Sequence, residues 1–207
     1  MGTKPLKKWD LLSDQGGALM VLSAAFLLGG ILGCLFASLS DGAGAQELGR
    51  YLAGYLELAG EEGGLPRSLW PVLWGQFKYL LAVLILNVTA LGAAGIPLIF
   101  GIRGFYLSFP AACFCRVFGG RGLFPAFLLF GLPALLWAPA LFLAGVPGLL
   151  SALRQLRRSG GEGRSPFSLS RVNWYRGGAC AALTLAAGLL EYWVVPVLLQ
   201  AAAHVVL

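Results

Sequence analysis

The strongest constraint in this sequence is a set of long apolar stretches that carry no charged residue. Residues 17–40 contain no Asp, Glu, Lys or Arg, and residues 123–152 contain none over 30 positions. A helix of about 20 apolar residues crosses the hydrocarbon core of a bilayer. Charged residues make up only 12% of the chain, which is about half the usual share in soluble domains and leaves too little polar surface to face water. The sequence therefore predicts an all-α, polytopic transmembrane helix bundle.

A tail at 1–16 precedes a single transmembrane domain at 17–207, in which we predict five spans. They lie at about 17–40, 79–101, 104–118, 123–152 and 178–200. The third span is short because Arg103 and Arg116 enclose it, so a re-entrant segment at 105–115 is the alternative to a tilted helix. The fourth contains four prolines and is either one long kinked helix or two broken pieces, which leaves six spans as the alternative count.

Lysine and arginine in the connecting segments predict the orientation, because these residues are retained on the cytoplasmic side. The tail at 1–16 carries three lysines, and the loop at 153–177 carries six arginines against Glu162 alone. With five spans, both segments lie in the cytoplasm, whereas the acidic loop at 41–77 and the C-terminus lie outside. The net charge of +6 is then mainly a topology signal and a contact with lipid headgroups, and we expect no nucleic-acid partner.

The outer loop at 41–77 contains the one segment that looks soluble. Its apolar residues recur at helical spacing, and two tryptophans follow, which favour the headgroup level of a membrane. One interpretation is a short amphipathic helix on the outer membrane face, and the other is a docking surface for a partner. The residues concerned are Leu48, Tyr51, Leu52, Tyr55, Trp70 and Trp74.

No arrangement of residues typical of a catalytic or cofactor site occurs in the sequence. The four cysteines lie in or beside apolar stretches without a CxxC pair, and His204 is the only histidine. Zinc, haem and iron–sulfur sites need clustered ligands. Phosphate-binding loops, nucleophile elbows and zinc-protease motifs are also absent. We therefore expect no cofactor, no metal ion and no enzymatic activity.

Small residues spaced along the predicted spans indicate helix packing. In lipid, such residues let two helix backbones approach closely. They either pack within the bundle or keep one face for another membrane subunit. The predicted packing positions are Gly29, Gly33, Gly95, Pro97, Gly101 and Gly104.

Three polar or helix-breaking residues interrupt the apolar stretches: Asn87, Glu191 and Pro196. An ionised carboxylate inside the hydrocarbon costs about 2.5–3.5 kcal/mol or more, so we expect Glu191 to be neutral unless a partner balances its charge. Asn87 lies at a comparable predicted depth, so we predict a hydrogen bond between the two side chains. Pro196 would release backbone carbonyls one turn away. The alternative is that Glu191 is the coupling carboxylate of a small transporter or channel.

Several short motifs follow one another in a characteristic order. They are "FLLGGILGCLFASLS" (26–40), "YL" (51–52), "WGQFKYL" (74–80), "GIPLIFGIRGF" (95–105), "LPALLWAPALFLAG" (132–145) and "LLEYWVVPVLLQ" (189–200). This order resembles the stage II sporulation protein M family over about residues 17–200. The resemblance implies a noncatalytic anchor in the mother-cell membrane during forespore engulfment. It would gather two peptidoglycan-degrading partners, stage II sporulation proteins D and P, at the septum.

Overall fold

The structure is a computed structural model, which describes residues 8–39, 47, 50, 54, 68–158 and 171–206. These residues are almost entirely helical, and no strand occurs among them, so the predicted all-α class is confirmed. The long helices are α1 (Lys8–Leu39), α3 (Leu69–Leu86), α4 (Gly92–Phe118), α6 (Leu132–Arg158) and α7 (Arg171–Val206). Three short elements join α4 to α6: η1 (Gly119–Gly122), α5 (Leu123–Ala126) and η2 (Phe127–Gly131), the last of which is one π-helical turn.

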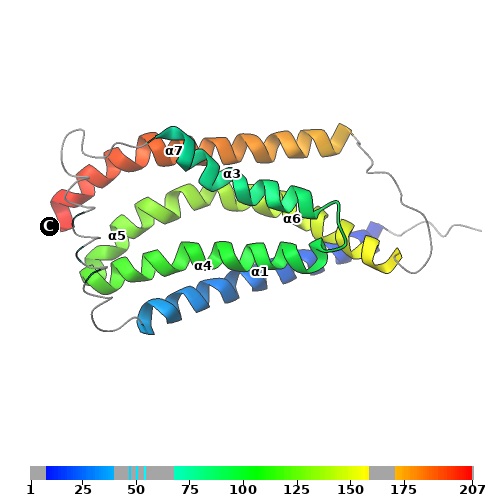
Figure 1. Ribbon diagram of the computed structural model, residues 1–207, viewed down its shortest axis with the longest axis horizontal. Helices are drawn as coiled ribbons and strands as arrows, with labels where there is room; N and C mark the ends of the chain where they lie inside the picture. Colours follow the sequence, from blue (N-terminus) through cyan, green and yellow to red (C-terminus); the bar gives the residue numbers. More distant parts are fainter. Residues whose placement is uncertain are drawn as a thin grey trace, which may run out of the picture.

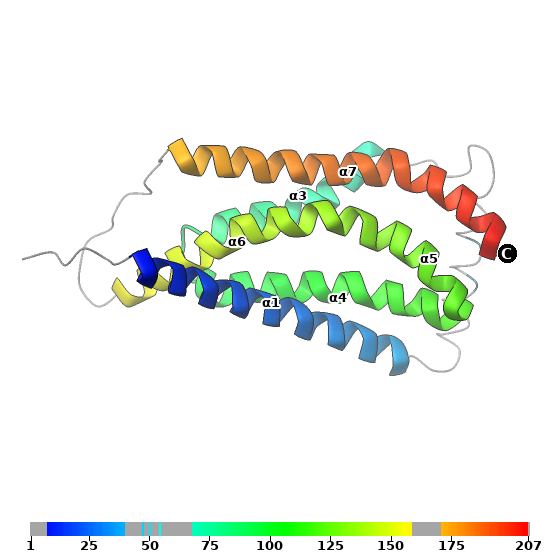
Figure 2. The same cartoon turned by 180° about the vertical axis from the view of Figure 1, so that it is seen from behind.

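The long helices lie side by side along the length of the molecule, and successive ones run in opposite directions (Figures 1 and 2). The start of α1, the α3–α4 turn, the end of α6 and the start of α7 share one end of the bundle (Figure 1). The end of α7 lies at the other end, with the end of α1 and the α4–α5 connection (Figure 1).

Four described stretches are long and apolar enough to cross a membrane: Gln15–Leu39, Leu69–Leu86, Gly92–Leu156 and Tyr175–Leu198. The third is 65 residues long and folds back on itself at Gly119, whose φ of 61° favours glycine. It therefore supplies two antiparallel rods, α4 and the run from α5 to α6. The described residues thus form a multi-pass helical membrane bundle in which we distinguish five rods.

The predicted boundaries of the second and third spans, 79–101 and 104–118, were wrong. The chain turns at residues 87–91, so α3 begins ten residues before the predicted span, and α4 continues without a break through Arg103. Residues 105–115 are therefore the second half of a 27-residue helix and do not re-enter. The turn is tight because Gly92 meets the preceding helix: a Cβ atom there would lie 2.3 Å from the carbonyl oxygen of Leu86.

The predicted fourth span, 123–152, is one kinked helical run and not two separate pieces. The π-helical turn η2 lies between two prolines, Pro125 and Pro133. Pro133 has no N–H to donate to the carbonyl four residues earlier, so the regular α-helical ladder is interrupted at this point. Helix α6 then continues past two further prolines to Arg158.

Helices α1 and α4 pack backbone to backbone at the α1–α4 glycine contact, formed by Gly29, Gly33, Gly101 and Gly104. A Cβ atom at Gly29 would lie 1.9 Å from the carbonyl oxygen of Gly101, and one at Gly104 would lie 2.1 Å from that of Phe26. At Gly33 the nearest backbone atom of α4 would be 2.9 Å away. These four predicted packing positions are thus used inside the bundle.

The other two predicted packing positions lie outside this contact. A Cβ atom at Gly95 would meet the side chain of Leu86 at 2.9 Å, so this glycine fits the end of α3 against α4. Pro97 lies inside α4 and is half-buried. It is the sixth residue of the helix, so its ring nitrogen leaves the carbonyl oxygen of Ala93 without the N–H donor that a regular helix would supply.

Candidate functional site

A polar cluster of three side chains, Gln76, Arg103 and Glu191, lies inside the bundle. Each comes from a different helix: α3, α4 and α7. The amide nitrogen Nε2 of Gln76 donates a hydrogen bond of 2.7 Å to Oε2 of Glu191. The amide oxygen of Gln76 accepts a hydrogen bond from Nη2 of Arg103. Gln76 therefore links the cation on α4 to the carboxyl group on α7.

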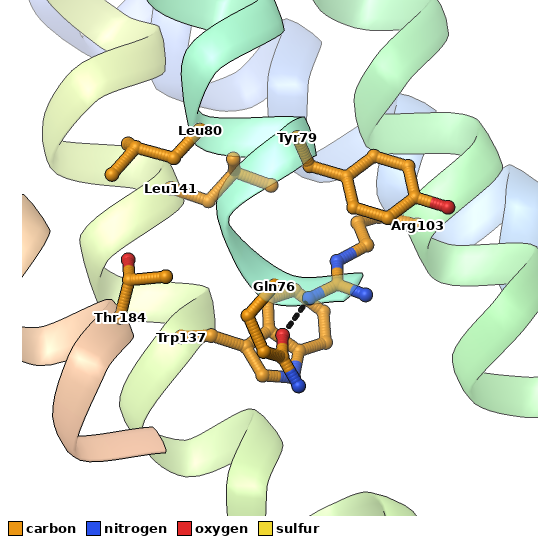
Figure 3. Close-up of a pocket in the computed structure, with 7 residues that line it drawn as sticks. All are labelled: Gln76, Tyr79, Leu80, Arg103, Trp137, Leu141 and Thr184. Carbon is orange, nitrogen blue, oxygen red and sulfur yellow. Dashed lines mark hydrogen bonds between the residues drawn. The ribbon is translucent and has the colours of Figure 1, made fainter. Parts of the chain in front are cut away.

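Two aromatic rings enclose the guanidinium group of Arg103. Its Cζ atom lies 4.0 Å from the ring centroid of Trp137 on α6 and 4.4 Å from that of Tyr79 on α3. Figure 3 shows Arg103 beside both rings, with its hydrogen bond to Gln76 drawn. A cation over an aromatic face gains about 2 kcal/mol or more where water is excluded. The rings thus supply part of the stabilisation that water would give this cation outside the membrane.

The polar cluster lies near half the depth of the bundle. Arg103 follows the start of α4 by eleven residues, and Gln76 precedes the end of α3 by ten. At 1.5 Å per residue, both positions are about 15 Å from the α3–α4 turn, which is half of a hydrocarbon core of about 30 Å. A lone charge at this depth is costly, so opposite charges joined through an amide are the arrangement expected of a stable bundle.

A small cavity of about 10 Å³ adjoins the cluster. Substrate and cofactor sites usually enclose about 300–1,000 Å³, so this cavity is far too small for an organic ligand. All four helices around the cluster contribute to its lining (Figure 3). The lining residues are Gln76, Tyr79, Leu80, Arg103, Trp137, Leu141 and Thr184.

The predicted hydrogen bond between Glu191 and Asn87 was wrong. Asn87 lies at the end of α3, eleven residues beyond Gln76, which places it about 16 Å along the helix from the partner that Glu191 uses. The error follows from the misplaced span boundary, because Asn87 belongs to the turn at the end of the bundle. Glu191 is half-buried and bonds to Gln76 in its place. Helix α7 continues through Pro196, five residues further on, to Val206.

Sequence reasoning missed four members of this site: Gln76, Tyr79, Arg103 and Trp137. Arg103 was interpreted as the boundary before the third span, whereas it lies in the middle of α4. One signal was available. Arg103 and Glu191 are opposite charges set within long apolar sequence, and pairing is the least costly way to hold both in lipid.

The predicted docking residues fall into two groups. Leu48, Tyr51, Leu52 and Tyr55 lie outside the described residues. Trp70 and Trp74 lie on the first turns of α3, where their side chains are 72% and 52% exposed. Their rings are stacked, with centroids 6.4 Å apart and planes 13° apart, so they form one aromatic surface.

Within the described part of the chain, no group of three His, Cys, Asp or Glu side chains is placed to hold a metal ion. Cys113 and Cys180 are buried thiols in α4 and α7. Comparison of the chain with protein-family models, with curated proteins and with solved structures finds no match.

Proposed function

We propose that the chain is a noncatalytic membrane scaffold, which recruits and anchors peptidoglycan hydrolases at the sporulation septum during forespore engulfment. The family resemblance supplies the partners, stage II sporulation proteins D and P. The geometry of the polar cluster supplies the support for a structural role.

The observation that carries this proposal is that the polar groups of the cluster are occupied by contacts between helices. Arg103 is held by two aromatic rings and by Gln76, and Gln76 in turn holds Glu191. These contacts join α3, α4, α6 and α7 at one level. Removing one partner of a buried charged pair is strongly destabilising. We infer that the cluster fixes the bundle as a rigid platform.

For the orientation, we propose that the N-terminus is cytoplasmic, the C-terminus is outside, and the protein sits on the mother-cell side of the septum. The positive-inside rule supports this arrangement. The start of α1, the end of α6 and the start of α7 lie together at one end of the bundle (Figure 1). The C-terminal end of α7 lies at the opposite end (Figure 1). Tags at the two termini should differ in their access to a membrane-impermeant reagent. Equal access at both termini would contradict five spans.

A second function, that of a small transporter or channel, is favoured by one observation. Ionisable residues at mid-membrane depth often mark ion or proton pathways, and Glu191 and Arg103 lie at such a depth. The small size of the adjoining cavity, about 10 Å³, favours the scaffold instead.

The experiment is affinity purification of the tagged chain from sporulating cells that produce it, with wall hydrolases identified by mass spectrometry. We expect the two hydrolases to co-purify during engulfment. The same purification from vegetative cells is the control for non-specific capture. If neither hydrolase co-purifies from sporulating cells, the scaffold proposal fails.

Two substitutions of one residue separate the scaffold from the transporter. Glu191→Gln keeps an oxygen that can accept the hydrogen bond from Gln76, whereas Glu191→Leu removes it. A scaffold should keep its partners in the Gln variant and lose them, with its stability, in the Leu variant. A transporter should show proton flux in proteoliposomes that Glu191→Gln abolishes.

A further inference from the structure

A lysine lies on the exposed face of α3. Lys78 is exposed, although it belongs to a stretch long and apolar enough to cross a membrane. At about 100° per residue, it shares a strip of α3 about 80° wide with four large exposed side chains, those of Trp70, Trp74, Leu81 and Ile85. Helix α3 lies on the front of the bundle in Figure 1 and behind α6 and α7 in Figure 2. This strip, the α3 outer face, therefore points away from the helices against which α3 packs.

Lys78 lies too deep in the bundle for its ammonium group to reach the lipid headgroups. It follows the start of α3 by nine residues and precedes the end by eight. At about 1.5 Å per residue, these intervals correspond to about 14 and 12 Å. The four-carbon stem of a lysine side chain is shorter than either distance. Snorkelling to the membrane surface, which serves lysines near helix ends, therefore does not remove this charge from the hydrocarbon.

The charges at this depth do not balance within the described part of the chain. The ring centroid of Tyr79 lies 4.4 Å from Cζ of Arg103 and 5.0 Å from Nζ of Lys78, so one ring adjoins two cations. Glu191 is the one acidic residue in the four described stretches that can cross a membrane, and Gln76 joins it to Arg103. Lys78 lies on the other side of α3 from Gln76, because two residues correspond to about 200° around a helix. Lys78 thus has no acidic partner in these four stretches.

We propose that the α3 outer face docks a membrane helix of another protein, which carries an aspartate or glutamate at mid-depth, and that this carboxylate pairs with Lys78. Charged groups inside a bilayer almost always pair with one another or with backbone carbonyls, and an acid neutralises the cation that this chain leaves exposed. The aromatic and aliphatic side chains of the same strip give the partner helix a surface to pack against along nearly all of α3.

A second copy of the chain fits this face less well than an acidic helix does. In a twofold dimer the same patch of both subunits meets, which would bring two Lys78 side chains together in the hydrocarbon, where like charges repel strongly. The inference concerns the chemistry of the partner helix and does not depend on the partner's being a wall hydrolase.

The test uses two fluorescent leucine–alanine helices of about 20 residues as probes, one with a glutamate at its centre and the other with a leucine there. Energy transfer from each probe to the labelled chain in proteoliposomes measures their association, at a low probe density that limits contacts between probes. We expect the glutamate helix to associate about tenfold more strongly than the leucine helix. Equal association of the two probes would overturn the proposal. Because the assay contains no hydrolase, its failure is distinct from a failure of co-purification.

Two variants of Lys78 test whether the preference comes from this face. Lys78→Leu should bind both probes equally, and an unchanged Tm is the control for its fold, since the side chain is exposed. Lys78→Glu should reverse the preference, so that a third probe with a central lysine binds more strongly than the glutamate helix. A preference for glutamate that persists in Lys78→Leu would place the binding on another group and overturn the proposal.

Two other occupants of the α3 outer face have their own signatures. Energy transfer between two labelled copies of the chain that Lys78→Leu abolishes would identify a second copy. A preference for the glutamate helix that appears only after the five acidic residues at 41–67 are replaced by their amides would identify the outer loop. Either result would overturn the assignment of the face to a helix of another protein.

Discussion

At the α1–α4 glycine contact, the predicted cost of a Gly→Ala substitution depends on which of two facing glycines is changed. In Gly29→Ala the new Cβ atom would lie 1.9 Å from the carbonyl oxygen of Gly101, whereas ordinary contacts begin at 3.4 Å. The two helices would have to separate by about 1.5 Å. In Gly101→Ala the nearest atom, the carbonyl oxygen of Ala25, is already at 3.4 Å. The first substitution should therefore be costly and the second nearly neutral.

The size of the effect follows from the cost of overpacking. Forcing a methyl group into a filled contact costs about 1–3 kcal/mol. For a chain of this length, about 2 kcal/mol corresponds to a fall in Tm of about 4–8 °C. We expect that fall for Gly29→Ala and little change for Gly101→Ala.

Thermal unfolding in detergent, followed with a thiol-reactive fluorophore, measures this difference. Cys113 and Cys180 are buried, at 3% and 1% exposure, and become reactive when the bundle opens. Gly178→Ala in α7 is the matched control, because no atom lies within 4 Å of the position of its Cβ. If Gly29→Ala melts together with Gly178→Ala, the two helices are not in backbone contact and the packing argument is refuted.

Three further predictions concern charged and aromatic residues. Arg103→Met should lower Tm by at least as much as Gly29→Ala, because a buried charged pair that loses one partner is destabilised by about 3–5 kcal/mol. Adding Glu191→Leu, which removes the other partner, should recover part of that loss in a double-mutant cycle. Arg116→Ala should lower Tm by about 2–4 °C, because Nη1 of Arg116 bonds to the carbonyl oxygens of Ala37 and Ser38 at 2.5 and 2.8 Å, a contribution of about 1 kcal/mol. In proteoliposomes, replacing both Trp70 and Trp74, two of the six tryptophans, by Phe should reduce the quenching of tryptophan emission by spin labels placed near the headgroups, since these stacked rings favour that level.

Each of these outcomes has a contrary result. A double variant of the polar cluster that is no more stable than Arg103→Met alone would mean that the two charges do not interact. An unchanged Tm in Arg116→Ala would show that solvent replaces its two hydrogen bonds. A quenched fraction that is unchanged by the loss of both tryptophans would place the start of α3 at another depth.

The helical class and the glycine positions could be predicted because they depend on local patterns. Uncharged runs identify membrane helices, and glycines four residues apart form one face of a helix. Gly29 and Gly33 illustrate this, since both meet α4 through backbone atoms.

Local sequence patterns could not predict the break at 87–91 or the role of Arg103. The sequence from 79 to 101 carries no charge, so its hydropathy does not reveal a turn inside it. Arg103 has the opposite problem, because its charge suggested the end of a span. Its aromatic neighbours come from 24 residues earlier and 34 residues later in the chain, and only tertiary packing brings them to it.

The polar cluster also sets an order for biogenesis. Gln76 and Arg103 belong to helices that leave the ribosome long before Glu191 on α7. Gln76, which donates the hydrogen bond to that carboxyl group, is thus already in the bilayer when the last helix is inserted. A chain cut short before α7 would keep Arg103 in lipid without the carboxyl group that Gln76 links to it.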